Sequence, residues 1–100
     1  MESLRLRQQA GEKYNQTSSL VGVAGLALRE DTPQLAAQLL GAVSSALKTL
    51  NVVLEADIIH FHTQTLAAVR EQLGEAAFQS AFEEGSQWSL EEAVRKALEA

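Results

Sequence analysis

Two histidines, His60 and His62, are the side chains of this sequence best suited to metal binding or proton transfer. On a helix, residues two positions apart point about 200° away from each other, so the pair cannot share one metal ion as histidines four positions apart can. His62 also falls in a row of apolar residues at helical spacing, namely Ile58, Leu66, Val69 and Leu73. We therefore predict a structural histidine at the edge of the core, with metal binding or pH sensing as the alternative.

Side chains suited to catalysis are present, but not in catalytic patterns. Four glutamates surround a turn at 85–88, namely Glu83, Glu84, Glu91 and Glu92, and the last two are explained by the favourable effect of acids at a helix N-terminus. The serines do not form a G-x-S-x-G motif, and the sequence has no phosphate-binding glycine loop. Without cysteine there is no thiolate nucleophile or ligand. These patterns predict a protein that is not an enzyme, with no catalytic residues, metal or cofactor.

Aromatic residues supply the remaining candidates for binding. Trp88 and Tyr14 are possible surface anchors, because aromatic side chains dominate many protein interfaces. We expect Trp88 instead to fill the turn between the last two helices, against Phe78 or Phe82.

These side chains must be positioned by helices. The 100 residues suffice for one domain, and 46% apolar with 21% charged residues is a globular balance. A single proline and abundant Ala, Leu, Gln and Glu favour helices over strands. No apolar run approaches the roughly 18 residues of a membrane span, and no secretory leader is visible. We expect an all-α, cytoplasmic protein that does not enter a membrane.

The charge distribution argues against direct binding of nucleic acid. The net charge is −5, and residues 74–100 contain six acidic and two basic side chains. Residues 1–29 contain four basic and two acidic side chains, which is a weak basic face for a DNA backbone.

Apolar periodicity and boundary residues predict the helices. Gly11, Gly74 and Gly85 are read as helix stops. Thr32 and Pro33 are a typical N-cap and first position, and Ser89 opens a capping box. The predicted helices cover residues 2–9, 12–29, 33–49, 55–73, 75–84 and 89–99, with an inward-packing loop at 48–54. Gly22 and Gly25 are interpreted as points of close approach by a neighbouring helix.

Residues 17–50 have the length and pattern of one tetratricopeptide-like helical hairpin. Small residues, Ala24 and Ala36, stand where the two paired helices approach each other. We expect antiparallel hairpins in one helical domain over 1–100: a remnant helix at 2–9, a hairpin at 12–50, and a long helix with a capping pair at 55–99.

Three blocks carry a more specific resemblance. They are AAQLLGA at 36–42, LGEAAFQSAFEEG at 73–85 and SLEEAV at 89–94. With these blocks the chain resembles the extreme C-terminal tail of large bacterial signalling ATPases and LuxR-type transcriptional regulators, which have an NTPase core and a tetratricopeptide-like sensor region. The resemblance covers about residues 3–99 and consists of packing and capping patterns.

The resemblance implies a protein-interaction or sensor module at the C-terminus of a bacterial transcriptional regulator, and so a fragment of a larger chain. Its partners would be the rest of the parent chain or a second copy of itself. The expected interaction surface comprises Leu20, Val23, Leu28 and Trp88. Two alternatives remain open, a small ligand-binding domain with His62 and Trp88 in a pocket, and a self-standing homodimeric bundle.

Overall fold

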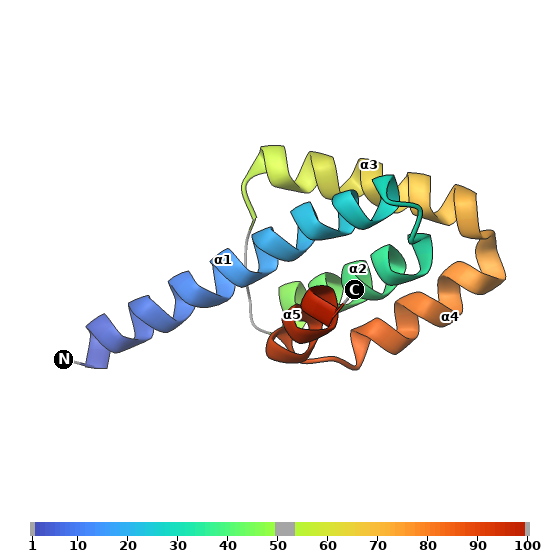
Figure 1. Cartoon of the computed structure of the whole chain (residues 1–100). Helices are drawn as coiled ribbons and strands as arrows, with labels where there is room; N and C mark the ends of the chain where they lie inside the picture. The colour runs from blue at the N-terminus through green and yellow to red at the C-terminus, as the bar shows by residue number, and fades with distance from the viewer. Residues whose placement is uncertain (1, 50–53, 100) are drawn as a thin grey trace.

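Helix α2 lies at the centre of the fold, and each of the other helices packs against it. The computed structural model describes residues 2–49 and 54–99, with side chains from residue 11 onward. Within these ranges it contains five helices and no strand: α1 (Glu2–Arg29), α2 (Pro33–Thr49), α3 (Ala56–Leu73), α4 (Glu75–Ser86) and α5 (Leu90–Glu99). Helices α1 to α4 run in alternating directions (Figure 1). The predicted all-α class with antiparallel hairpins is confirmed, whereas the tetratricopeptide type of the repeat stays a prediction.

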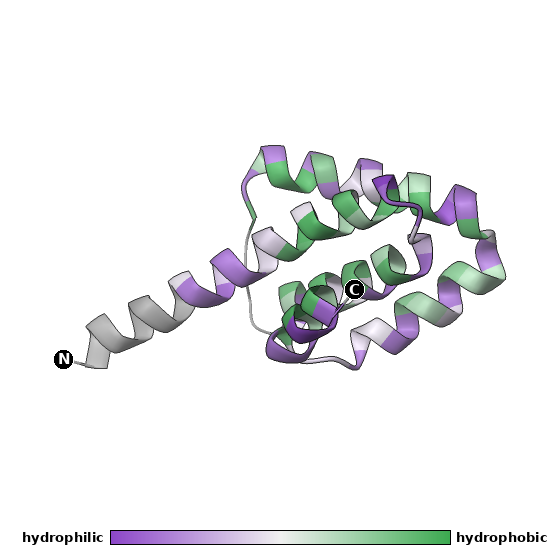
Figure 2. Cartoon of the chain, in the orientation of Figure 1, coloured by the Kyte–Doolittle hydropathy of each residue, from purple (hydrophilic) through white to green (hydrophobic). Residues whose placement is uncertain are grey.

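The core follows from the composition of α2. Its buried residues are mostly small or aliphatic, namely Ala36, Ala37, Leu39, Leu40, Gly41, Ala42, Val43 and Ala46. A helix that is apolar on nearly every side is stable only where neighbours cover it on every side. Figure 2 shows the same concentration of hydrophobic residues along α2 and the C-terminal half of α1. Ala24 and Ala36, where close approach of the paired helices is predicted, are both fully buried.

Two glycines allow α4 to cross α2 at very short range. A Cβ atom added at Gly41 of α2 would meet the carbonyl of Phe82, and one added at Gly85 of α4 would meet the backbone of Gln38. The prediction that Gly85 ends its helix is wrong, since α4 continues to Ser86. Gly85 is there because the neighbouring backbone leaves no room for a side chain.

The turn between α1 and α2 is closed by its backbone and by one hydroxyl. Asp31 has a positive φ of 64°, and the amides of Asp31 and Thr32 donate to the carbonyls of Leu28 and Ala27. This is a Schellman motif with Asp in the position that glycine usually takes. The hydroxyl of Thr32 also donates to Ala27, at 2.8 Å. The Thr32 hydroxyl therefore caps the end of α1, while the Thr32 carbonyl accepts the first bond of α2 from Ala36, so the predicted N-cap position before Pro33 is confirmed.

Helix α1 is continuous from Glu2 to Arg29, so the helix stop predicted at Gly11 and the separate helix at 2–9 are wrong. Gly11 has no neighbour within 4 Å of the place a Cβ would take. Glycine in an exposed helix costs about 1 kcal/mol relative to alanine, which a helix of this length tolerates. The N-terminal part of α1 extends beyond the other helices (Figure 1).

Helix α3 begins and ends close to the predicted bounds. It ends at Leu73, and Gly74 follows with a positive φ of 83°. An ion pair between Arg70 and Glu75, 3.4 Å apart, spans this turn. The predicted inward packing of the 48–54 loop holds at Leu54, which is buried, while residues 50–53 lie outside the described residues.

Helix α5 starts as its sequence predicts. The amide of Glu92 donates to Ser89 Oγ at 3.1 Å, which is the N-cap bond of the predicted capping box. The expected capping pair forms differently, because α4 packs on α2 while α5 packs back on α1 and α2, and α4 and α5 barely touch. Each of the two helices packs its own apolar face against the central helix α2.

Candidate functional site

His62 is a half-buried residue of α3, as its position in the apolar row predicts. Its Nδ1 atom is buried and has no hydrogen-bond partner among the described residues. Burial lowers the pKa of His62 below its ordinary value of 6.5, because the charged imidazolium loses solvation. His60 is exposed, and within the described ranges no three His, Asp or Glu side chains gather as potential metal ligands.

The acidic side chains around the α4–α5 turn do not converge on one another. Glu83, Glu84 and Glu91 are exposed, and Glu92 faces Arg95 at 3.9 Å. Exposed carboxylates of this kind are solvated and lack the enclosed surroundings that general acid–base chemistry needs.

Trp88 is partly buried against the core at the α4–α5 turn. The Lys96 ammonium lies 5.7 Å from the centre of its ring, within the range of a cation–π contact. Phe78 and Phe82 pack on each other, with ring centroids 5.4 Å apart. Trp88 therefore lies partly buried at the turn as expected, with the Lys96 ammonium over its ring, whereas its expected contact with Phe78 or Phe82 stays a prediction.

The residues of the expected interaction surface do not lie on one exposed face. Leu20 is 1% exposed and belongs to the core, while Val23 and Leu28 are partly buried against it. The prediction that Leu20 lies on a free surface is wrong, because α1 turns this side toward the other helices. Trp88 lies on a different part of the molecule, in the turn between α4 and α5.

An exposed apolar surface does exist on α1 and α3, formed by other residues. Leu26 of α1 is 52% exposed and Phe61 of α3 is 43% exposed. They border a hollow of about 230 Å³ together with Gly22, Gly25 and Arg29. These five residues are called the α1–α3 patch. The Phe61 ring lies against Gly25, where a Cβ would clash with it, whereas Gly22 has no neighbour within 4 Å of that position. The close approach predicted at the two glycines is thus confirmed for Gly25 only.

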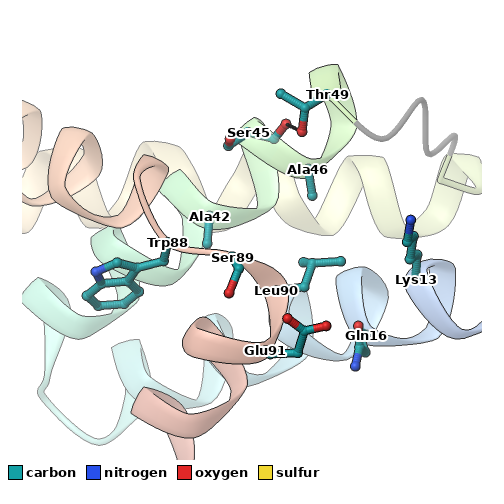
Figure 3. A pocket seen from close by; sticks show the side chains of 10 residues that line it. All are labelled: Lys13, Gln16, Ala42, Ser45, Ala46, Thr49, Trp88, Ser89, Leu90 and Glu91. Atoms are coloured by element: carbon teal, nitrogen blue, oxygen red, sulfur yellow. Dashed lines mark hydrogen bonds between the residues drawn. The ribbon is translucent and has the colours of Figure 1, made fainter.

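A second hollow, of about 290 Å³, lies between α1, α2 and the start of α5. Figure 3 shows Trp88 at one end and Lys13 at the other, with Leu90 and Glu91 between them. Gln16 and Ser45 also line this α1–α2–α5 hollow, whereas His62 does not. The expected pocket shared by His62 and Trp88 is therefore wrong for the histidine.

Sequence reasoning identifies Gly22 and Gly25 of the α1–α3 patch and Trp88 of the α1–α2–α5 hollow, and it misses the other residues of both surfaces for the same reason. The α1–α3 patch was signalled only by Gly22, Leu26 and Arg29, which recur at four and three positions and so share one face of α1. Phe61 and Glu91 come from other helices, and no local spacing relates them to α1.

Comparison with protein-family models, with curated proteins and with solved structures gives no match to this chain. The resemblance to the tails of LuxR-type regulators therefore stays a prediction from the sequence. Among the described helices, none has the length and apolar character needed to cross a membrane.

Proposed function

We propose that this chain is a non-enzymatic protein-interaction module, the C-terminal part of the helical sensor region of a cytoplasmic bacterial transcriptional regulator. Its partner is another helix surface, either from the preceding part of the parent chain or from a second copy. In this function the module takes part in signal transduction through contacts between proteins.

The observation that carries the proposal is the α1–α3 patch. Leu26 and Phe61 are two of the four large apolar side chains that remain exposed among the described residues. Gly22 lies beside them with open space over its backbone, so a second helix can approach closely. Burial of such a surface contributes about 25 cal/mol per Å² of apolar area, which favours association once the entropic cost of pairing is met.

The sequence supports the choice of partner. The three blocks that resemble regulator tails are α2, the α3–α4 turn with α4, and the start of α5. All three take part in internal packing, which leaves the α1–α3 patch free for a neighbour. An isolated chain would cover this patch with a second copy, and a two-fold axis is the simplest arrangement for identical surfaces.

A single cysteine in the patch tests this arrangement, because the natural chain contains none. A residue near a two-fold axis faces its own copy, so Leu26→Cys should form a disulfide-linked dimer in mild oxidant at tens of micromolar protein. Denaturing electrophoresis without reductant measures the linked fraction.

Leu98→Cys is the matched control, since Leu98 is 81% exposed on α5, away from the patch. We expect little linked dimer from it under the same conditions. Equal linking of both variants would reflect random collision and would count against the α1–α3 patch as the contact surface.

A further inference from the structure

The α1–α2–α5 hollow combines an apolar floor with polar side chains that do not pair with one another among the described residues. Leu90 and Trp88 supply apolar surface, while Lys13, Gln16 and Glu91 stand around its polar end. Figure 3 shows these side chains coming from α1 and from the start of α5, with α2 on the opposite side. An apolar concavity with a few convergent polar groups is the usual form of a small-molecule site.

Lys13 and Glu91, which border this hollow, carry opposite charges and do not form an ion pair with each other. Among the described residues, the ion pairs join Arg70 to Glu75 and Arg95 to Glu92, and neither Lys13 nor Glu91 takes part in one. Ser45 and Gln16 on the same walls likewise make no side-chain hydrogen bond within the described part of the chain. A ligand that carries both a carboxylate and an ammonium group can use both charges at once.

The size of the hollow limits the ligand. Its volume is about 290 Å³, at the lower end of the roughly 300–1,000 Å³ of small-molecule pockets, so a ligand of about ten non-hydrogen atoms suits it. An α-amino acid with an aliphatic or aromatic side chain has about this number of atoms. Its side chain would lie over Leu90 toward Trp88, where burial of apolar surface favours binding.

We infer that the α1–α2–α5 hollow binds a free apolar α-amino acid. The carboxylate lies at Lys13, the ammonium group lies at Glu91, and the side chain contacts Leu90 and the edge of Trp88. This site shares no residue with the α1–α3 patch, so it is independent of the interaction proposed above.

Trp88 is the only tryptophan, so its fluorescence reports directly on this hollow. Titration with L-leucine and L-phenylalanine should give a saturable change with a Kd on the order of 0.1–1 mM, as a small ligand in an open site allows. Leucinamide lacks the carboxylate and 4-methylpentanoate lacks the ammonium group, and each should bind about tenfold more weakly for one lost charge-assisted hydrogen bond.

Two variants test which residue binds the carboxylate of the ligand and which binds its ammonium group. Lys13→Gln should weaken L-leucine about tenfold and remove its advantage over leucinamide, and Glu91→Gln should remove its advantage over 4-methylpentanoate. Lys48→Gln and Glu83→Gln change exposed charges outside the hollow and should leave binding unchanged. All four positions are exposed, so circular dichroism should show unchanged folding.

Two results would overturn the inference. One is the absence of any saturable fluorescence change up to about 20 mM of either amino acid, well above the expected Kd. The other is binding that Lys13→Gln and Glu91→Gln leave unaltered, which would show that the two residues are surface charges only. Neither result bears on dimer formation through the α1–α3 patch, which is measured separately.

Discussion

The imidazole of His62 is a polar group whose environment suits only one of its protonation states. Its Nδ1 atom is buried without a partner among the described residues, so a second proton on the ring would be poorly solvated. The row of apolar residues around His62 predicts this position correctly. The absence of a hydrogen-bond partner for Nδ1 could not be predicted, because it depends on which side chains of the neighbouring helices surround the ring.

Acidification should destabilise the fold through His62. Burial lowers the pKa of His62 in the folded chain below 6.5, so the unfolded chain binds the proton more readily. The contribution of neutral His62 is therefore complete above about pH 6.5 and decreases as the pH falls through this value toward the folded pKa. One proton allows a slope of at most about 1.4 kcal/mol per pH unit. Urea unfolding at several pH values between 5 and 8 measures this slope of the free energy of unfolding.

His62→Leu should remove this part of the pH dependence, whereas His60→Gln should retain it, because His60 is exposed. The three proteins have the same acidic residues, so the difference between variants isolates the histidine. An identical pH slope in His62→Leu and the natural chain would show that His62 does not sense pH.

Glycine has different structural roles at different positions in these helices. Gly85 lies where α4 meets the backbone of Gln38, and Gly22 lies where nothing approaches within 4 Å. The sequence predicts the α2 bounds well, because Pro33 fixes the start of that helix. It cannot distinguish a glycine that ends a helix from one that admits a neighbour, because the difference depends on packing between helices. The helix end predicted at Gly85 is wrong for this reason, whereas Gly11 is an exposed glycine that a long helix tolerates.

Replacing Gly85 and Gly22 by alanine should change the free energy of unfolding in opposite directions. Gly85→Ala requires α2 and α4 to separate and should destabilise the fold by about 1–3 kcal/mol, the typical cost of overpacking. Gly22→Ala should stabilise it by up to about 1 kcal/mol through helix propensity. Thermal unfolding at about 1 µM, below the concentrations expected for association, measures both effects. A Gly85→Ala protein as stable as the natural chain would contradict the close crossing of α2 and α4.

At the scale of the whole molecule, both surfaces described above are formed by residues from more than one helix. Leu26 and Phe61 share the α1–α3 patch, and Lys13 and Glu91 share the α1–α2–α5 hollow. Composition and periodicity are sufficient to predict the all-α class and most helix bounds. They could not predict the rotation of α1, which buries Leu20 and exposes Leu26, because α1 has apolar or small residues on several sides.

Sedimentation equilibrium of the isolated chain tests most directly whether the α1–α3 patch is an interaction surface. We expect a dimer at tens of micromolar, driven by burial of Leu26 and Phe61. Leu26→Glu should dissociate this dimer while the fold is retained, because the side chain is half exposed. Leu98→Glu introduces the same charge elsewhere and should leave the dimer intact. A chain that stays monomeric at millimolar concentration, or a dimer that Leu26→Glu does not weaken, would contradict the proposal.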